Sequence, residues 1–168
     1  MDLQLEIARA GSRKQVEKIV KYVGSNAARF ALLVSVFLRG PYRITQRASQ
    51  PLGYCVERYP ELIAPHLKKI LDLLDQPDAP VAVKRNMLRM LQFTELPKKF
   101  QGRIIQRCFD LLMDKREPVA VHVFAMSVLN RLVKDIPEMK QELRLIIEDR
   151  LPYASPAFIS RARKVLRT

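Results

Sequence analysis

The residues of this chain whose types and spacing could do chemistry are mainly basic. Lys99, Arg103 and Arg107 follow one another at intervals of four, so on a helix they lie one above another, with Lys98 beside them. Like charges at this spacing repel by roughly a few tenths of a kcal/mol per pair. The row therefore indicates a surface that meets anions, unless acids on a neighbouring helix offset its charge. The sequence leaves both interpretations open.

A second set of polar residues recurs at a spacing of 38 residues, and each member is followed four residues later by an acid. On a helix these are i,i+4 contacts on an exposed face. The face either pairs with itself in solvent or forms a polar stripe that orients a partner. The column is Lys68, Gln106 and Arg144, followed by Asp72, Asp110 and Glu148. The partner-binding residues that the sequence predicts are Lys68, Lys69, Lys99, Arg103, Arg107 and Arg144.

The overall charge is also strongly basic. Thirty Lys and Arg against seventeen Asp and Glu give a net charge of +13. Such a field attracts nucleic acid, an anionic membrane or an acidic protein, and it also keeps a protein soluble by self-repulsion. A further basic strip is predicted on another set of helices, from Arg43, Arg47, Lys84, Arg85 and Arg89. A last basic group stands where it favours a helix dipole, at Arg161, Arg163, Lys164 and Arg167.

No motif in the sequence indicates catalysis, a cofactor or a metal. A Gly-rich phosphate loop, a Gly-x-Ser-x-Gly elbow and a His-Glu-x-x-His pair are all missing. His66 and His122 each stand alone, which favours structural imidazoles. Cys55 and Cys108 lie far apart in apolar patterns and are predicted to be core residues in a reducing compartment. We therefore expect a cytoplasmic protein that is not an enzyme, with no signal peptide and no membrane partner.

The elements that must position these residues are set by a repeat. Pro80-Val81-Ala82-Val83-Lys84 returns as Pro118-Val119-Ala120-Val121-His122, and looser copies begin at Pro41 and Pro156. After each proline the helical spacing predicts the same inward positions. These are Ala48, Met87 and Ala125, then Leu52, Leu91 and Leu129, whereas the last copy has Arg163 and Arg167 there. Such charged residues suit a terminal helix whose outer face meets water.

Apolar periodicity, caps and prolines predict the helices around this register. A short helix over 2–10 ends at Gly11, Ser12 caps the next, and Gly24 ends that one. The helix over 27–39 is apolar almost all round and is predicted to be deeply buried. The remaining helices are predicted at 42–58, 61–75, 81–94, 98–114, 119–135, 138–150 and 157–167.

Paired helices at a period near 38, with a proline in the elbow and an acid in the turn before a Val-rich helix, resemble HEAT or armadillo-type repeats. The resemblance implies an all-α fold, a right-handed α–α superhelix of about four helical hairpins, in which second helices line the concave surface. It implies one domain, 1–168, with capping helices at 1–40, repeats at 41–79, 80–117 and 118–155, and a capping helix at 156–168. The arginine that typical HEAT units carry after the Val is replaced here by Thr45, Lys84, His122 and Ser160.

Two functions are compatible with this architecture. The first is a non-enzymatic scaffold that binds a protein or acidic partner on its concave face. The second is a nucleic-acid-binding module that uses phosphate contacts, whose affinity would fall steeply with salt. It is distantly similar to the HEAT-like alkylpurine DNA glycosylases, which are small, basic and all-helical. Those enzymes use Trp prominently, and this sequence has none, so their activity is not carried over. The sequence does not indicate an oligomeric state.

Overall fold

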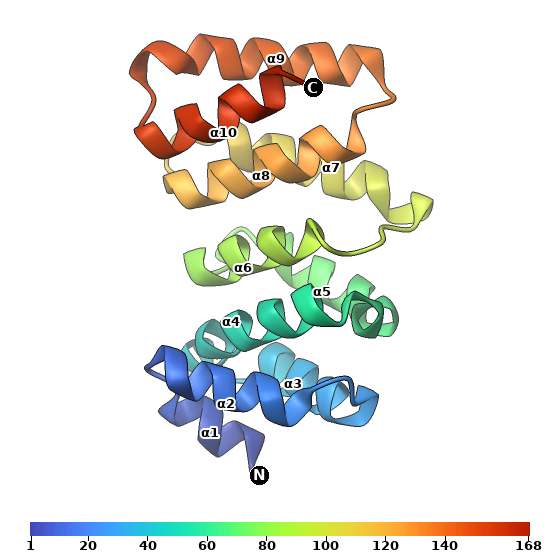
Figure 1. Ribbon diagram of the computed structural model, residues 1–168, viewed down its shortest axis with the longest axis vertical. Coiled ribbons are helices and arrows are strands. Elements are labelled where there is room, and N and C mark those ends of the chain that lie inside the picture. The colour runs from blue at the N-terminus through green and yellow to red at the C-terminus, as the bar shows by residue number, and fades with distance from the viewer. The chain divides into compact units, whose positions relative to one another are not determined.

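The computed structural model describes every residue from Met1 to Thr168 and is entirely helical (Figure 1). It divides into two compact units, residues 1–95 (the N-unit) and residues 96–168 (the C-unit). The predicted all-α fold is confirmed. The N-unit contains α1 (Leu3–Arg9), α2 (Arg13–Val23), α3 (Ala27–Arg39), α4 (Tyr42–Arg58), the 3-10 helix η1 (Pro60–His66), α5 (Leu67–Leu74) and α6 (Val81–Leu91). The C-unit contains α7 (Lys98–Met113), α8 (Val119–Leu132), α9 (Pro137–Arg150), the 3-10 helix η2 (Leu151–Tyr153) and α10 (Pro156–Leu166).

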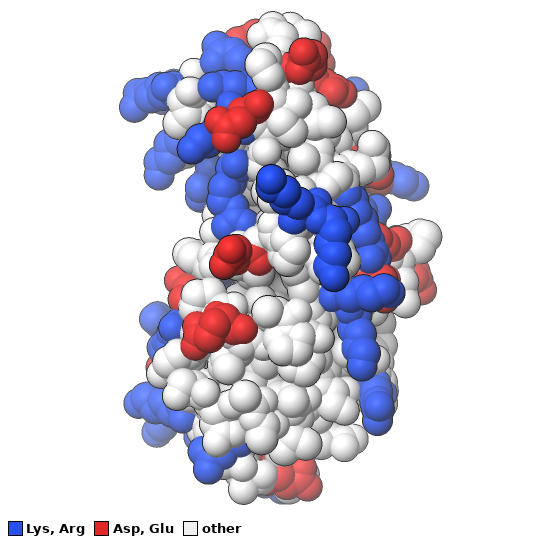
Figure 2. Space-filling view, turned by 90° about the vertical axis from the view of Figure 1, so that its right-hand side faces the viewer, with Lys and Arg blue, Asp and Glu red and all other residues white.

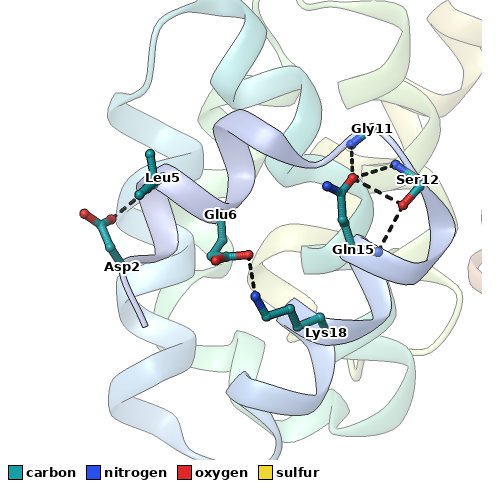
Figure 3. A network of polar contacts seen from close by, with 7 residues as sticks. All are labelled: Asp2, Leu5, Glu6, Gly11, Ser12, Gln15 and Lys18. Carbon is teal, nitrogen blue, oxygen red and sulfur yellow. Dashed lines mark hydrogen bonds and ion pairs between the residues drawn. The ribbon is translucent and has the colours of Figure 1, made fainter.

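Helix α2 begins and ends at the predicted caps, whereas α1 ends at Arg9, shortly before the predicted stop at Gly11. Ser12 Oγ accepts from the Gln15 backbone N–H at 3.3 Å, and Gln15 Oε1 accepts from the Ser12 N–H at 3.1 Å (Figure 3). This reciprocal capping box satisfies donors that the first turn of α2 would otherwise leave unpaired. Gly24 ends α2 with φ +52°, a left-handed conformation that favours glycine.

One predicted helix is wrong. The expected continuous helix over 61–75 is divided into η1, which ends at His66, and the short α5, which begins at Leu67. Pro65 lies inside η1 and has no backbone N–H to donate, and its ring crowds the preceding turn. The segment therefore forms a tighter 3-10 helix before regular α-helix begins.

The N-unit is built around α4. First helices α2, α4 and α6 stack in sequence, and α3 packs against α4 from the second layer with α5 beside it (Figure 1). The predicted inward residues on α4 and α6 are fully buried: Ala48, Leu52, Met87 and Leu91. A buried polar link also joins these two helices, because the Asn86 amide donates to Ser49 Oγ at 3.0 Å.

The C-unit places α8 between α7 and α10, with α9 also in contact with α8. Val121, Ala125 and Leu129 are fully buried on α8, as the repeat register predicts. In the fourth copy Ile159, the third residue after the repeat proline, is only half-buried, and its neighbour Phe158 is the buried one. The register therefore predicts the core well in the middle copies and less well in the last.

The helix α3 is not buried on all sides as predicted, because Leu32 is 57% exposed and meets solvent. Phe93, just after α6, is also exposed, at 41%. The thiols behave as predicted: Cys55 and Cys108 are free and fully buried, and burial raises the pKa of each to about 12. None of the helices combines the length and the apolar character that crossing a bilayer requires.

Candidate partner-binding surfaces

Helix α5 presents two of the predicted residues. Leu67, Ile70, Leu71 and Leu74 are buried, which leaves Lys68 and Lys69 exposed on the outer face. Lys68 Nζ lies 2.9 Å from Asp72 Oδ2, the predicted i,i+4 pair. Such exposed pairs stabilise a helix by only about 0.3–0.5 kcal/mol, so a partner can displace this one at small cost.

Helix α7 carries the basic row. Lys99 is exposed, with Nζ 5.1 Å from the centroid of the Phe100 ring. Arg103 and Arg107 are half-buried, and neither is without a partner. Gln106 donates to Asp110 Oδ1 at 2.9 Å, as predicted. The row therefore has one exposed charge and two half-buried arginines that each already have a partner.

Helix α9 holds Arg144, which has a structural role that the sequence did not reveal. One nitrogen lies 3.6 Å from Glu148 Oε1, the predicted pair, while Nη1 donates to the Leu166 carbonyl at 3.0 Å. Lys140 Nζ similarly donates to the Thr168 carbonyl at 2.9 Å. Both cations satisfy carbonyls that the C-terminal turn of α10 leaves unpaired.

The structure thus forms all three predicted i,i+4 contacts and groups the six predicted residues by helix. Lys68 and Lys69 are neighbours on α5, the row Lys99, Arg103 and Arg107 shares α7, and Arg144 is the one member on α9. The close pairs are exposed and weak, so these surfaces are polar and only lightly self-paired.

The first helices of the N-unit enclose a polar groove of about 600 Å³ that sequence reasoning found only in part. Arg47 of α4 and Arg85 of α6, both in the predicted basic strip, line it together with Arg13 of α2. Other members of the strip are used elsewhere. Lys84 is buried, and Arg89 pairs with Glu57 and lies 4.4 Å from the centroid of the Tyr54 ring.

The outer face of α2 forms a second basic surface, shared with Arg58 of α4 and containing one acid, Glu17. Arg58 Nη2 lies 2.7 Å from Glu17 Oε1, and this hydrogen bond lowers the pKa of the carboxyl. On the face drawn in Figure 2, basic side chains gather along both sides, one run begins near the middle of the face, and a broad part of the N-unit has no charge.

The C-unit contains a pocket of different character, with a volume of about 470 Å³. It lies where α8, η2 and α10 meet, and its apolar wall includes Val119, Phe158 and Tyr153, the last of which is 91% exposed. Arg150 adds a charge at the wall, with its guanidinium carbon 5.9 Å from the centroid of the Phe158 ring. The sequence did not predict this pocket.

His122 forms part of the same pocket and is held by the backbone. Its Nε2 lies 2.9 Å from the Asp114 carbonyl oxygen, so this nitrogen is the donor. Burial lowers the pKa of His122, and the carbonyl contact partly opposes that shift. The imidazole is therefore neutral near pH 7, which agrees with the predicted structural role.

Comparison with known proteins decides the family. The model of the HEAT repeat domain matches residues 3–168. The chain belongs to the HEAT repeat domain family. Searches of curated proteins and of solved structures found no match.

In HEAT repeat terms, the six predicted residues all lie on second helices, and the N-unit groove lies on first helices. No group of three or more His, Cys, Asp or Glu residues is arranged to hold a metal ion. The HEAT repeat family generally serves as helical scaffolding, typically for protein interaction. The surfaces that distinguish this member are therefore its polar second-helix faces, the groove of the N-unit and the pocket of the C-unit.

Proposed function

We propose that this HEAT repeat protein is a non-enzymatic scaffold that binds a protein partner on the concave face that second helices line in such repeats. The observation that carries the proposal is the recurrence of the same weak polar contact on three second helices. Lys68 with Asp72, Gln106 with Asp110 and Arg144 with Glu148 present polar groups at matching repeat positions. Such a stripe can orient a partner because its own pairs are easily exchanged.

The six proposed contact residues would contribute to this binding in different ways. Lys68, Lys69 and Lys99 are exposed and would attract carboxylates of the partner. Arg103 and Arg107 would widen the basic side of α7, and Arg144 would contribute the polar edge of α9. We also infer a cytoplasmic location from the two unpaired thiols, and a single repeat domain from the family match that spans both units.

The net charge of +13 supports a second candidate, nucleic-acid binding through phosphate contacts. Acids lie among the basic side chains on the face drawn in Figure 2, which favours a protein partner. The two candidates differ in salt dependence, because bound Lys and Arg release counterions from nucleic acid.

The test starts with immobilised protein, an extract of the source organism and mass spectrometry of the retained proteins. The triple variant K68E/K69E/K99E should weaken the affinity of a retained partner by about tenfold or more. The matched variant K21E/K134E/K164E makes the same change of net charge at other exposed lysines and should leave affinity within about threefold. Equal loss in both variants would contradict the proposal. Tight, steeply salt-dependent binding of DNA or RNA without a retained protein would support the second candidate.

A further inference from the structure

The groove on the first helices of the N-unit has the chemistry of a binding site in its own right. We infer that it binds an acidic segment of a protein partner in an extended conformation. This inference goes beyond the proposed function, because it concerns α2, α4 and α6 and makes no use of the second-helix residues.

The charges of the groove supply the first argument. Three guanidinium groups, from Arg13, Arg47 and Arg85, line it, and no carboxylate does. Arg13 and Arg85 are exposed and make no hydrogen bond or ion pair, while Arg47 donates from one nitrogen to the Ala8 carbonyl. Planar guanidinium groups bind carboxylates with two parallel hydrogen bonds, so three of them with spare donors match a row of acidic side chains.

The uncharged groups of the groove supply the second argument. Gln46 and Gln50 lie one turn apart on α4 and line it as well. Each amide offers both a donor and an acceptor, which is the complement of a peptide backbone. The amide of Asn86 is already used, because it donates to Ser49 Oγ and to the Ala82 carbonyl, so it forms a fixed floor.

The one aromatic residue of the groove argues for a peptide over a nucleic acid. Proteins that bind single strands combine basic grooves with aromatic faces on which bases stack. Tyr54 is the aromatic residue that lines this groove, and the guanidinium of Arg89 covers its ring at 4.4 Å from the centroid. Arg89 is itself fixed by its ion pair with Glu57. The groove therefore offers cations and amides, and one face of its aromatic ring is already covered.

Fluorescence anisotropy tests the inference with the full chain. The probe is a short fluorescein-labelled peptide of alternating Glu and Ser, and an oligouridylate of equal net charge is the comparison. The peptide should bind more tightly than the oligouridylate. The variant R13E/R85E should weaken peptide binding by about tenfold or more. The variant R43E/K21E changes α4 and α2 by the same charge outside the groove and should change the affinity by less than about threefold.

A neutral variant separates groove binding from general attraction to a basic protein. Q46L/Q50L keeps every charge and removes two amides, and it should weaken peptide binding by about threefold or more. Circular dichroism confirms that each variant is folded. Equal effects of R13E/R85E and R43E/K21E, no effect of Q46L/Q50L, or tighter binding of the oligouridylate would each overturn the inference. Because K68E/K69E/K99E leaves the groove intact, it should retain peptide binding, so the two proposals fail or stand separately.

Discussion

The N-unit groove and the C-unit pocket are both formed with the help of first helices, yet their chemistry is opposite. The groove is lined by arginines and amides, whereas the pocket has Val119, Phe158 and Tyr153 in its wall. The repeat register relates the first helices of the two units. The fifth residue after the repeat proline is Arg85 in the groove, where α8 has Val123, while the seventh is the buried Met87 and Ala125. The repeat constrains what is buried and leaves outward positions free to differ.

The largest expected effects come from the inward positions. Leu52→Ala in the N-unit and Leu129→Ala in the C-unit should each lower the free energy of unfolding by about 2–5 kcal/mol, because each leaves a cavity at a fully buried site. Urea unfolding measures the loss. Hydrogen exchange shows whether it stays in the substituted unit. If amide hydrogen exchange became faster by the same factor along the whole chain, residues 1–168 would unfold as one domain.

Substitution of two glycines should change the stability by smaller amounts and in opposite directions. A Cβ at Gly40 would lie 2.7 Å from Ile44 Cγ2 and 2.8 Å from the Val36 carbonyl, so Gly40→Ala should destabilise the protein by about 1–3 kcal/mol. A Cβ at Gly102 in α7 would meet nothing within 4 Å. Gly102→Ala should therefore stabilise by about 0.5–1 kcal/mol through helix propensity. Thermal unfolding of both variants checks the signs, and a stabilising Gly40→Ala would contradict the packing described around α3 and α4.

Arg144 and Lys68, which occupy equivalent repeat positions, should also contribute different amounts to the stability. Arg144→Ala removes a hydrogen bond to the Leu166 carbonyl as well as an ion pair, and should cost about 1 kcal/mol. Lys68→Ala removes only the exposed pair with Asp72 and should cost about 0.3–0.5 kcal/mol. Chemical denaturation of both variants measures the difference. Equal costs would mean that Arg144 does not stabilise the end of α10.

The smallest effect concerns the histidines, one in each unit. Burial lowers the pKa of both His66 and His122, so below their unfolded pKa near 6.5 the unfolded chain binds more protons than the folded one. Stability should therefore be fully present above that pH and decline as the pH falls below it. His66→Asn with His122→Asn should flatten this part of the pH profile. Lys69→Gln should raise the pKa of His66, measured by NMR titration, and leave His122 unchanged, because Lys69 acts on His66 alone.

Sequence periodicity predicted the features that depend on neighbours along the chain. The caps at Ser12 and Gly24, the buried leucines of the register and the i,i+4 contacts are all local, and all are confirmed. The divided segment 60–74 was missed because its apolar pattern continues across Pro65, although the proline itself was the available signal.

The surfaces were harder to predict because they are formed by residues that are far apart in the sequence and meet only in the folded protein. Arg13 stands far from Arg47 and Arg85 in the sequence, and it joins them only because α2, α4 and α6 pack in order. Periodicity identifies the outward side of each helix, but it does not say which outward side chains share a groove. The same reason hid the contact between Arg144 and Leu166, which joins two separate helices.

The placement of the cysteines gives each unit its own internal probe. Cys55 lies in the N-unit and Cys108 in the C-unit, and both thiols are inert while the surrounding helices remain closed. Their alkylation by iodoacetamide therefore requires local opening, and the two rates, followed by mass spectrometry of the resulting peptides, measure how often each unit opens. The wild-type chain can thus report its breathing motions at two places without a single engineered label.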